Sequence, residues 1–261
     1  MSRFEASTPR LFDLTGQIAL VTGSTRGIGL AAARALGAHG ATVILHGRDQ
    51  KQLDAVCGSL RAEGLQVESE AFDVTNLTAT GAAVDRIVAR HSTLDILFAN
   101  AGVTHRRNLL EEDAADFERV VFTNLTAQWT LARHAAQHMA TARHGRIIFA
   151  GSVTAIRGRP NMTAYTAAKG ALHALARQWS SELASKGVTV NALAPGYIQT
   201  ELTRALQEDA QFDEWLCKAT PVGRWGTTDD LRSAVLFLAA RESGFFTGQI
   251  LTVDGGITAC I

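Results

Sequence analysis

The sequence predicts an α/β protein: one doubly wound parallel sheet, a Rossmann fold, with a small helical lid for a substrate. Three observations support this fold class. Short apolar runs alternate with helical stretches along the chain, glycines cluster at the first junction between them, and polar side chains recur just after the apolar runs. Strands that alternate with helices indicate right-handed βαβ units and a parallel sheet covered on both faces.

Composition bounds the class of protein. The chain has 261 residues, of which 46% are hydrophobic and 19% charged, enough apolar material for a substantial core. Its 25 basic and 25 acidic residues give no net charge. This balance lacks the electrostatic footprint of a protein that binds nucleic acid or an anionic membrane, so neither partner is expected.

The cysteine spacing and the N-terminal residues indicate the cellular compartment. Cys57, Cys217 and Cys260 lie far apart, which suggests neither a zinc site nor a disulfide framework and fits a reducing cytosol. Residues 1–10 are polar and lack an apolar signal core, and the longest apolar runs are too short to span a bilayer. We therefore expect a cytoplasmic protein.

The elements follow in order. Residues 17–22 form a short apolar run with a turn signal after it, typical of a buried strand, and residues 27–36 are alanine-rich and helical. Further strands are predicted over 41–46, 66–72, 94–99, 145–150, 188–193 and 249–253. Further helices are predicted over 50–63, 79–91, 114–139, 164–184 and 229–239. No stretch resembles a linker, so residues 1–261 are predicted to form a single dinucleotide-binding domain.

Residues 200–225 interrupt this alternation. The segment follows the sixth strand and is rich in polar residues. In a doubly wound sheet ligands bind beyond the carboxyl ends of the strands, so an insertion there is placed to act as a lid. The alternative is a surface excursion without a gating role.

Glycines join the first strand to the first helix with the spacing Gly-x-x-x-Gly-x-Gly. Glycine lets the backbone turn tightly and approach a ligand closely, and the helix N-terminus offers free N–H groups to a pyrophosphate. The segment is therefore predicted to bind a dinucleotide through Gly23, Ser24, Thr25, Arg26, Gly27, Ile28 and Gly29.

Arginines near the second strand favour NADP over NAD. A fold that prefers NAD usually has an acidic residue at the end of this strand to hold the ribose 2′-hydroxyl, but here the nearest acid is Asp49, past the expected turn. Arg48 and Arg26 are placed for a 2′-phosphate, which suits the planar guanidinium. The alternative is two solvated arginines.

Tyr165 and Lys169 lie four residues apart in a predicted helix and so share one face. A free tyrosine has a pKa of about 10, and a positive charge nearby favours the phenolate and lowers that pKa. Such a tyrosine suits the proton transfer of an alcohol–carbonyl interconversion. The alternative is a surface tyrosine and lysine that only share a helix face.

The order of several short motifs carries a family resemblance. The glycine turn, Asp73-Val74, Asn100-Ala101-Gly102, Asn124, Ser152, Tyr165 with Lys169, Pro195-Gly196 and Asp254-Gly255-Gly256 follow one another, most of them at strand ends. In this order, over essentially the full length, the chain resembles the short-chain dehydrogenase/reductases. The family usually has two asparagines before Ala-Gly, and Ala99 takes the first place here.

The resemblance implies roles for these residues. Tyr165 is the general acid or base, Lys169 lowers the pKa of Tyr165 and holds the nicotinamide ribose, and Ser152 orients the carbonyl. Asn124 is implied to position a water that links Lys169 to solvent. The resemblance also implies contacts to the cofactor. Asp73, followed by Val74, is implied to contact the adenine amino group, and Asn100, followed by Ala101 and Gly102, the adenosine side. Ile198 and Thr200, which follow Pro195 and Gly196, are implied to hold the nicotinamide carboxamide. No metal is needed, and the family commonly forms homotetramers.

The substrate is indicated by a closer likeness. Residues 11–16, 46–48 and 212–226 are similar to the gluconate 5-dehydrogenases, which interconvert gluconate and 5-ketogluconate. Two loops expected at the substrate mouth carry arginines that would suit a carboxylate, namely Arg106, Arg107, Arg157 and Arg159. The alternative is that these loop arginines point to water.

Other functions are weighed against this one. The 3-oxoacyl-[acyl-carrier-protein] reductases look similar at the same catalytic residues, and Arg143 and Lys186 fall where those enzymes dock the acidic carrier protein. A nucleotide-sensing regulator without catalysis is a third possibility, which the intact catalytic set disfavours. His134 and His138 have a spacing that can bind metal, but no third ligand is evident. Cys217 could be a reactive thiol in the lid, although no sequence feature indicates a lowered pKa. Trp215 and Trp225 could close over the substrate or only pack the lid against the body.

Overall fold

A computed structural model describes residues 11–260. The polar segment 1–10, predicted to lack a signal core, and residue 261 lie outside the described residues, so the single-domain prediction over the whole chain stays a prediction. Residues 11–260 form a seven-stranded parallel sheet in the order β3-β2-β1-β4-β5-β6-β7, which confirms the predicted fold class. The strands are β1 (Ile18–Val21), β2 (Thr42–Gly47), β3 (Val67–Ala71), β4 (Ile96–Ala99), β5 (Gly145–Ala150), β6 (Val188–Pro195) and β7 (Ile250–Val253).

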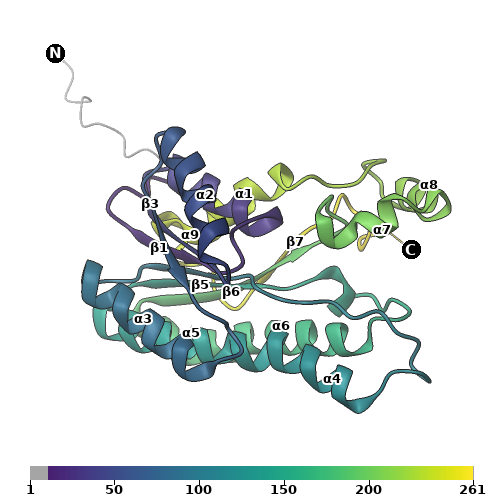
Figure 1. Cartoon of the computed structure of the whole chain (residues 1–261), viewed down its shortest axis with the longest axis horizontal. Coiled ribbons are helices and arrows are strands. Elements are labelled where there is room, and N and C mark those ends of the chain that lie inside the picture. Colours follow the sequence, from purple (N-terminus) through teal and green to yellow (C-terminus); the bar gives the residue numbers. More distant parts are fainter. Residues whose placement is uncertain (1–10, 261) are drawn as a thin grey trace.

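Helices cover both faces of the sheet (Figure 1). One face carries α1 (Gly27–Ala38), α2 (Gln50–Ala62) and α9 (Arg232–Ala239). The other carries α3 (Leu77–His91), α4 (Ala114–Val121), α5 (Ala127–Ala142) and α6 (Thr163–Leu183). The sheet is therefore the middle layer of three, as right-handed crossovers require.

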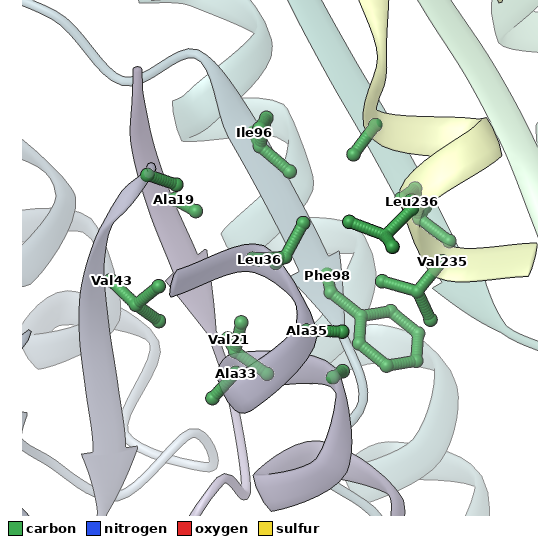
Figure 2. Close-up of a cluster of buried hydrophobic side chains, with 14 of the residues drawn as sticks. Ala19, Val21, Ala33, Ala35, Leu36, Val43, Ile96, Phe98, Val235 and Leu236 are labelled. Atoms are coloured by element: carbon green, nitrogen blue, oxygen red, sulfur yellow. The ribbon is translucent and has the colours of Figure 1, made fainter. Parts of the chain in front are cut away.

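Alternate side chains of each central strand feed two separate cores. In β1, Ala19 and Val21 join the cluster under α1 and α9, shown in Figure 2, while Ile18 and Leu20 join the cluster under α3 and α5. This period of two follows from the pleat of a strand. Burial on both faces explains why these strands read as continuous apolar runs in the sequence.

The long helix predicted over 114–139 is interrupted. A π-helical turn, Phe122–Thr126, separates α4 from α5. Such turns insert an extra residue and often lie at functional sites. Helical periodicity alone did not predict it, and it contains Asn124, a residue with no exposed surface.

The predicted lid is helical. Residues 200–225 include a 3₁₀ turn, Glu201–Thr203, then α7 (Arg204–Gln207) and α8 (Ala210–Ala219). In Figure 1 α7 and α8 project beside the end of β7, near the C-terminus. Among the described residues no helix is both long and apolar enough to cross a membrane.

Candidate active site

The site lies where the sheet reverses its strand order. β2 and β4 flank β1 on opposite sides, and in an open parallel sheet ligands bind beyond the carboxyl ends of strands at such a point. A cavity of about 950 Å³ begins there at the glycine turn. A second cavity of about 150 Å³ adjoins it and is lined by Ser152, Tyr165 and Lys169. Both cavities share Ile28, Asn100, Gly102, Val103, Thr200 and Leu202.

The glycine turn is built for close packing. A Cβ atom on Gly29 would lie 2.3 Å from the carbonyl oxygen of Gly23, and one on Gly23 would lie 3.1 Å from Cα of Ala101. Arg26 is the N-cap residue of α1 and makes no side-chain hydrogen bond there, so its side chain leaves the first amide groups of the helix free. The turn, its backbone donors and the cavity beside it fit the pyrophosphate of a dinucleotide.

Asn100 and Ser24 lie at the turn in different roles from those expected. The Asn100 amide donates to the carbonyl oxygens of Thr22, at 2.9 Å, and of Gly23, at 3.3 Å. Its donor therefore supports the turn, although Asn100 lines both cavities. Ser24 is buried, and its Oγ accepts the N–H of His46 at 2.8 Å, so this side chain faces β2 rather than the cavity.

Sequence reasoning missed His46, at the end of β2. The ring is 3% exposed and accepts the N–H of Gly23 on Nδ1 at 3.1 Å, while Nε2 lies 3.0 Å from the carbonyl oxygen of Phe72. Neutral imidazole can accept on Nδ1 while donating from Nε2. His46 thus ties the glycine turn to the ends of β2 and β3. Its position just before Gly47-Arg48 was the only available signal.

Because His46 is buried, its pKa is lowered from 6.5 to about 4. The unfolded chain binds a proton between these values that the folded protein does not, so the free energy of unfolding falls as the pH falls from 6.5 to about 4. At about 1.4 kcal/mol per pH unit, His46 accounts for a loss of roughly 3 kcal/mol. Urea denaturation across this range should show a clearly smaller loss for His46→Asn, which retains an acceptor. Equal losses in both proteins would contradict the assignment.

The far end of the larger cavity carries the residues predicted for the adenosine half. Asp73, Val74 and Arg48 line it, and Asp73 accepts both the N–H and the hydroxyl of Thr75, which lower its pKa. Asp49 also lines it, but its Oδ1 accepts the N–H groups of Lys51 and Gln52 and so caps α2. Asp49 is therefore engaged by the helix.

Arg26 differs from its expected place as a free phosphate ligand. Its guanidinium donates to Glu201 at 2.7 Å, and both side chains are more than half exposed. This ion pair joins the glycine turn to the start of the lid. Exposed pairs contribute little stability, so Arg26 can exchange Glu201 for another anion at low cost.

Three of the four predicted catalytic residues, Ser152, Tyr165 and Lys169, line the smaller cavity. Tyr165 and Lys169 lie one turn apart on α6, and Ser152 follows β5. Ser152 hydrogen-bonds the Tyr165 hydroxyl. The Lys169 ammonium donates to the carbonyl oxygen of Ala150 at 2.6 Å and lies 5.4 Å from the centroid of the Tyr165 ring.

The electrostatics of this triad correct one expectation. Burial raises the pKa of Tyr165, whereas the hydrogen bond from Ser152 and the charge of Arg106 lower it. Lys169 is not among the groups that shift this pKa, and its ammonium donates to the Ala150 carbonyl beside the Tyr165 ring. Burial also lowers the pKa of Lys169 to about 8.

Asn124 is held by the backbone of Val103. Its Oδ1 accepts the Val103 N–H at 2.9 Å and its Nδ2 donates to the Val103 carbonyl at 2.7 Å. The residue sits in the π-helical turn against Gly102, where a Cβ would lie within 2.4 Å of its Oδ1. Asn124 thus fixes the loop after β4, and its role in a water relay stays a prediction.

A further part of the wall of the smaller cavity comes from the end of β6 and the loop after it. The predicted residues Pro195, Gly196, Ile198 and Thr200 all line the smaller cavity. The Thr200 hydroxyl lies 3.3 Å from that of Thr203, which donates to the carbonyl oxygen of Ile198 at 2.7 Å. These bonds fix the first turn of the lid beside the cavity.

The four predicted substrate arginines separate into two groups. Burial and the charge of Arg159 lower the pKa of Arg106, whereas Tyr197 and Tyr165 raise it. Arg159 lies over the rings of Tyr197, at 5.0 Å, and Phe212, at 4.8 Å. In the described part of the chain neither Arg106 nor Arg159 has an acidic partner in an ion pair.

Arg157 and Arg107 are placed differently from the expected carboxylate site. Arg157 donates to the carbonyl oxygens of Ile257 and Cys260, both at 2.9 Å, so it anchors the C-terminal segment. Arg107 is exposed, and its charge acts on Asp116 at the start of α4. Their positions in the loops resembled those of Arg106 and Arg159, and sequence alone could not separate them.

The lid has its own small core. Trp225 is buried with Leu216 and Ile257, and its indole N–H donates to Asp213 at 2.6 Å. Trp215 is half exposed and packs on Phe212 with ring centroids 5.2 Å apart. Cys217 packs at the edge of this core. Trp225 therefore holds the lid together.

Two further sets of residues lie away from the site. His138 bonds Asp85 at 2.9 Å and His134 packs against Gly81, and within residues 11–260 no cluster of three or more His, Cys, Asp or Glu side chains could hold a metal ion. Arg143 and Lys186 lie just before β5 and β6 begin, whereas Ser152 follows the end of β5. A carrier protein bound at Arg143 and Lys186 would lie where β5 and β6 begin, at the opposite end of these strands from the catalytic residues.

Comparison with known proteins places this site in a class. A family model described as "Enoyl-(Acyl carrier protein) reductase" matches residues 23–258. Gluconate 5-dehydrogenase of Gluconobacter oxydans (strain 621H) is 41% identical over 255 residues, 98% of this chain and 100% of the relative. The 3-oxoacyl-[acyl-carrier-protein] reductase FabG of Rickettsia bellii is 37% identical over 247 residues, 95% of this chain and 99% of the relative.

A solved structure gives the same result. The crystal structure of a gluconate 5-dehydrogenase from Burkholderia cenocepacia J2315 in complex with NADP and tartrate matches with a TM-score of 0.93 and 41% identity, over 96% of this chain and 98% of that one. Fold, site and relatives together define an oxidoreductase of CH–OH groups that uses a nicotinamide cofactor. The chain belongs to the short-chain dehydrogenase/reductase family.

Proposed function

We propose that this enzyme reversibly reduces the ketone of a sugar acid, such as 5-ketogluconate to gluconate, with NADPH. The observation that carries the proposal is the arginine pair Arg106 and Arg159. The charge of Arg106 acts on Tyr165 and that of Arg159 acts on Arg106, and neither arginine has an acidic partner in an ion pair among residues 11–260. Two guanidinium groups that destabilise each other suit a bound carboxylate, which compensates both charges. The names of the relatives from Gluconobacter and Burkholderia support a sugar acid.

The residues of the small cavity account for the proton in this reaction. Ser152 donates a hydrogen bond to the substrate carbonyl oxygen, and Tyr165 gives its phenolic proton to the same oxygen as the carbon is reduced. The nicotinamide supplies the hydride when bound. Lys169 is placed one helical turn from Tyr165 to hold the cofactor ribose, and oxidation of the alcohol runs the same proton transfer in reverse.

The preference for NADP rests on the end of β2. Arg48 is exposed at the cavity, whereas the Asp49 carboxylate caps α2 and is not directed at a ribose hydroxyl. A guanidinium there favours a 2′-phosphate. Arg26 would complete the phosphate site by leaving Glu201. NADP in the Burkholderia structure supports this preference.

We also infer a homotetramer, the assembly expected from the family. Large apolar side chains remain exposed along α4, the π-helical turn and α5, namely Phe117, Phe122 and Trp129, and Phe245 is fully exposed before the last strand. Exposed apolar surface of this kind marks protein interfaces. We predict no role for nucleic acid or membrane.

The proposal is tested by incubating purified enzyme with NADPH and 5-keto-D-gluconate and following loss of the reduced nicotinamide. NADH and an acetoacetyl thioester serve as controls. Rapid turnover of the keto acid supports the sugar-acid function. Turnover of the thioester alone would instead support 3-oxoacyl reduction, for which the Rickettsia relative is the precedent. No turnover of either would favour the non-catalytic regulator.

Substitution of Arg106 tests the carboxylate site. Loss of a charge-assisted hydrogen bond of about 2 kcal/mol predicts that Arg106→Ala raises KM for 5-keto-D-gluconate about 30-fold. KM for NADPH should stay unchanged. Arg107→Ala is the matched control, because the charge of this neighbouring arginine acts on Asp116 and not on Tyr165, and it should change KM less than twofold. Equal effects of the two substitutions would exclude a carboxylate at Arg106.

A further inference from the structure

Ser152 is held at its hydroxyl by Thr154. The Ser152 Oγ accepts the Thr154 N–H at 3.2 Å and the Thr154 hydroxyl at 3.0 Å, and both residues are buried. A serine hydroxyl has two acceptor lone pairs and one hydrogen. With both lone pairs engaged by Thr154, the hydrogen of Ser152 must be donated elsewhere, and the Tyr165 hydroxyl is its partner.

Ser152 is held at its backbone by His173. This residue lies on α6 one turn beyond Lys169, is 5% exposed, and places Nε2 3.4 Å from the Ser152 N–H, which donates to it. Burial, with the charges of Arg177 and Lys169, lowers the His173 pKa to about 4, so the ring is neutral and able to accept. A neutral hydrogen-bond acceptor, Nε2 of His173, therefore lies beside the backbone of Ser152.

Gly151 makes room for this histidine. A Cβ atom at position 151 would lie 2.3 Å from Nε2 of His173 and 2.8 Å from its Cδ2. A Cβ atom at this distance forces a shift of the ring or of the loop, so any larger residue at 151 would push the imidazole away from the Ser152 N–H. Gly151 and His173 are thus matched to each other across β5 and α6.

We propose that Thr154 and His173 are positioning residues that together aim the Ser152 hydroxyl hydrogen at the oxygen atom protonated by Tyr165. Neither touches the reacting atoms. Thr154 sets which way the hydroxyl donates, and His173 sets where the serine backbone lies. The inference rests on the predicted role of Ser152 in carbonyl reduction and is independent of which ketone is reduced.

Paired substitutions test the proposal kinetically. Thr154→Val keeps the shape and removes the hydroxyl, whereas Thr154→Ser keeps it; His173→Leu removes the acceptor, whereas His173→Gln retains one. We expect Thr154→Val and His173→Leu to lower kcat about tenfold, with KM for NADPH changed less than twofold, and the conservative partners to recover most of the rate. The substrate is 5-keto-D-gluconate, or the acetoacetyl thioester if the keto acid is not turned over. A deuterium isotope effect from 4-deuterated NADPH should rise in the slow variants, because the chemical step has slowed.

A second measurement needs no substrate. The chain has only 2 tyrosines, so tyrosine labelled with ¹³C at Cζ gives two resonances, and Tyr197→Phe assigns them. The groups that act on Tyr165 are Ser152, whose hydrogen bond lowers its pKa, and Arg106, which also lowers it. Thr154→Val should therefore move the Tyr165 titration to higher pH, and Thr154→Ser should not.

The outcomes separate this proposal from the proposed function. A shifted Tyr165 titration together with slow turnover of the thioester alone would uphold the positioning role and refute the sugar acid. Unchanged kcat and unchanged titration in Thr154→Val, or a Thr154→Ser variant as impaired as Thr154→Val, would overturn the positioning role. Melting temperatures of all four variants show whether any loss reflects unfolding instead, and a kcat loss that tracks unfolding alone would also overturn it.

Discussion

Tyr165→Phe should abolish turnover while leaving NADPH binding intact. The substitution removes only the phenolic oxygen, which is the proton donor in reduction and the acceptor in oxidation. General acid–base catalysis contributes about 10²- to 10⁴-fold, so we expect kcat to fall by about 10³-fold. The ring and its contact with Lys169 are retained, so the dissociation constant for NADPH, measured by quenching of tryptophan fluorescence, should change less than threefold.

Tyr197→Phe is the matched control. It alters the only other tyrosine of the chain, which contacts the lid aromatics rather than Ser152. We expect it to retain at least a third of the wild-type kcat. If Tyr165→Phe kept more than a tenth of the activity, the proton would have to come from another group, and the assignment of Tyr165 would fail.

The fold was predictable because each strand carried a signal that depends only on local sequence. Strands buried on both faces read as apolar runs, and the ends of every predicted strand lie within two residues of the ends of an observed strand. The family resemblance placed Ser152, Tyr165 and Lys169 together, and the structure brings all three to one cavity. Tyr165 and Lys169 lie on α6 and Ser152 follows β5 closely, and the geometry of both elements follows from periodicity.

What escaped prediction depends on contacts between distant segments. Burial of Tyr165, its hydrogen bond with Ser152 and the charge of Arg106 shift the pKa of the tyrosine, and none of these is visible in the four-residue spacing to Lys169. The helical sequence pattern continues unchanged through the π-helical turn at Asn124, so it does not indicate where the helix is interrupted. Arg157 differs from Arg159 because it donates to the carbonyl oxygen of Ile257, a contact between segments 100 residues apart in sequence.

Gly29→Ala should destroy cofactor binding, although it adds a single methyl group. The new Cβ would lie 2.3 Å from the Gly23 carbonyl oxygen, 2.9 Å from its carbon, and 2.7 Å from Nδ2 of Asn100. The first two are backbone atoms of the turn itself, so the methyl group fits only if the turn moves away from α1. The Asn100 amide, which bonds the Thr22 and Gly23 carbonyls, would be displaced with it.

A displaced turn no longer presents its amide groups to the pyrophosphate at hydrogen-bonding distance. We therefore expect the dissociation constant for NADPH to rise at least 100-fold, about 2.7 kcal/mol, as measured by isothermal titration. Gly58→Ala, inside α2, is the control, because a Cβ there meets nothing within 4 Å. It should leave binding unchanged and stabilise the fold by about 0.5–1 kcal/mol, the helix propensity gained over glycine. NADPH binding by Gly29→Ala at near wild-type affinity would show that the close approach of α1 to the turn is not what forms the cofactor site.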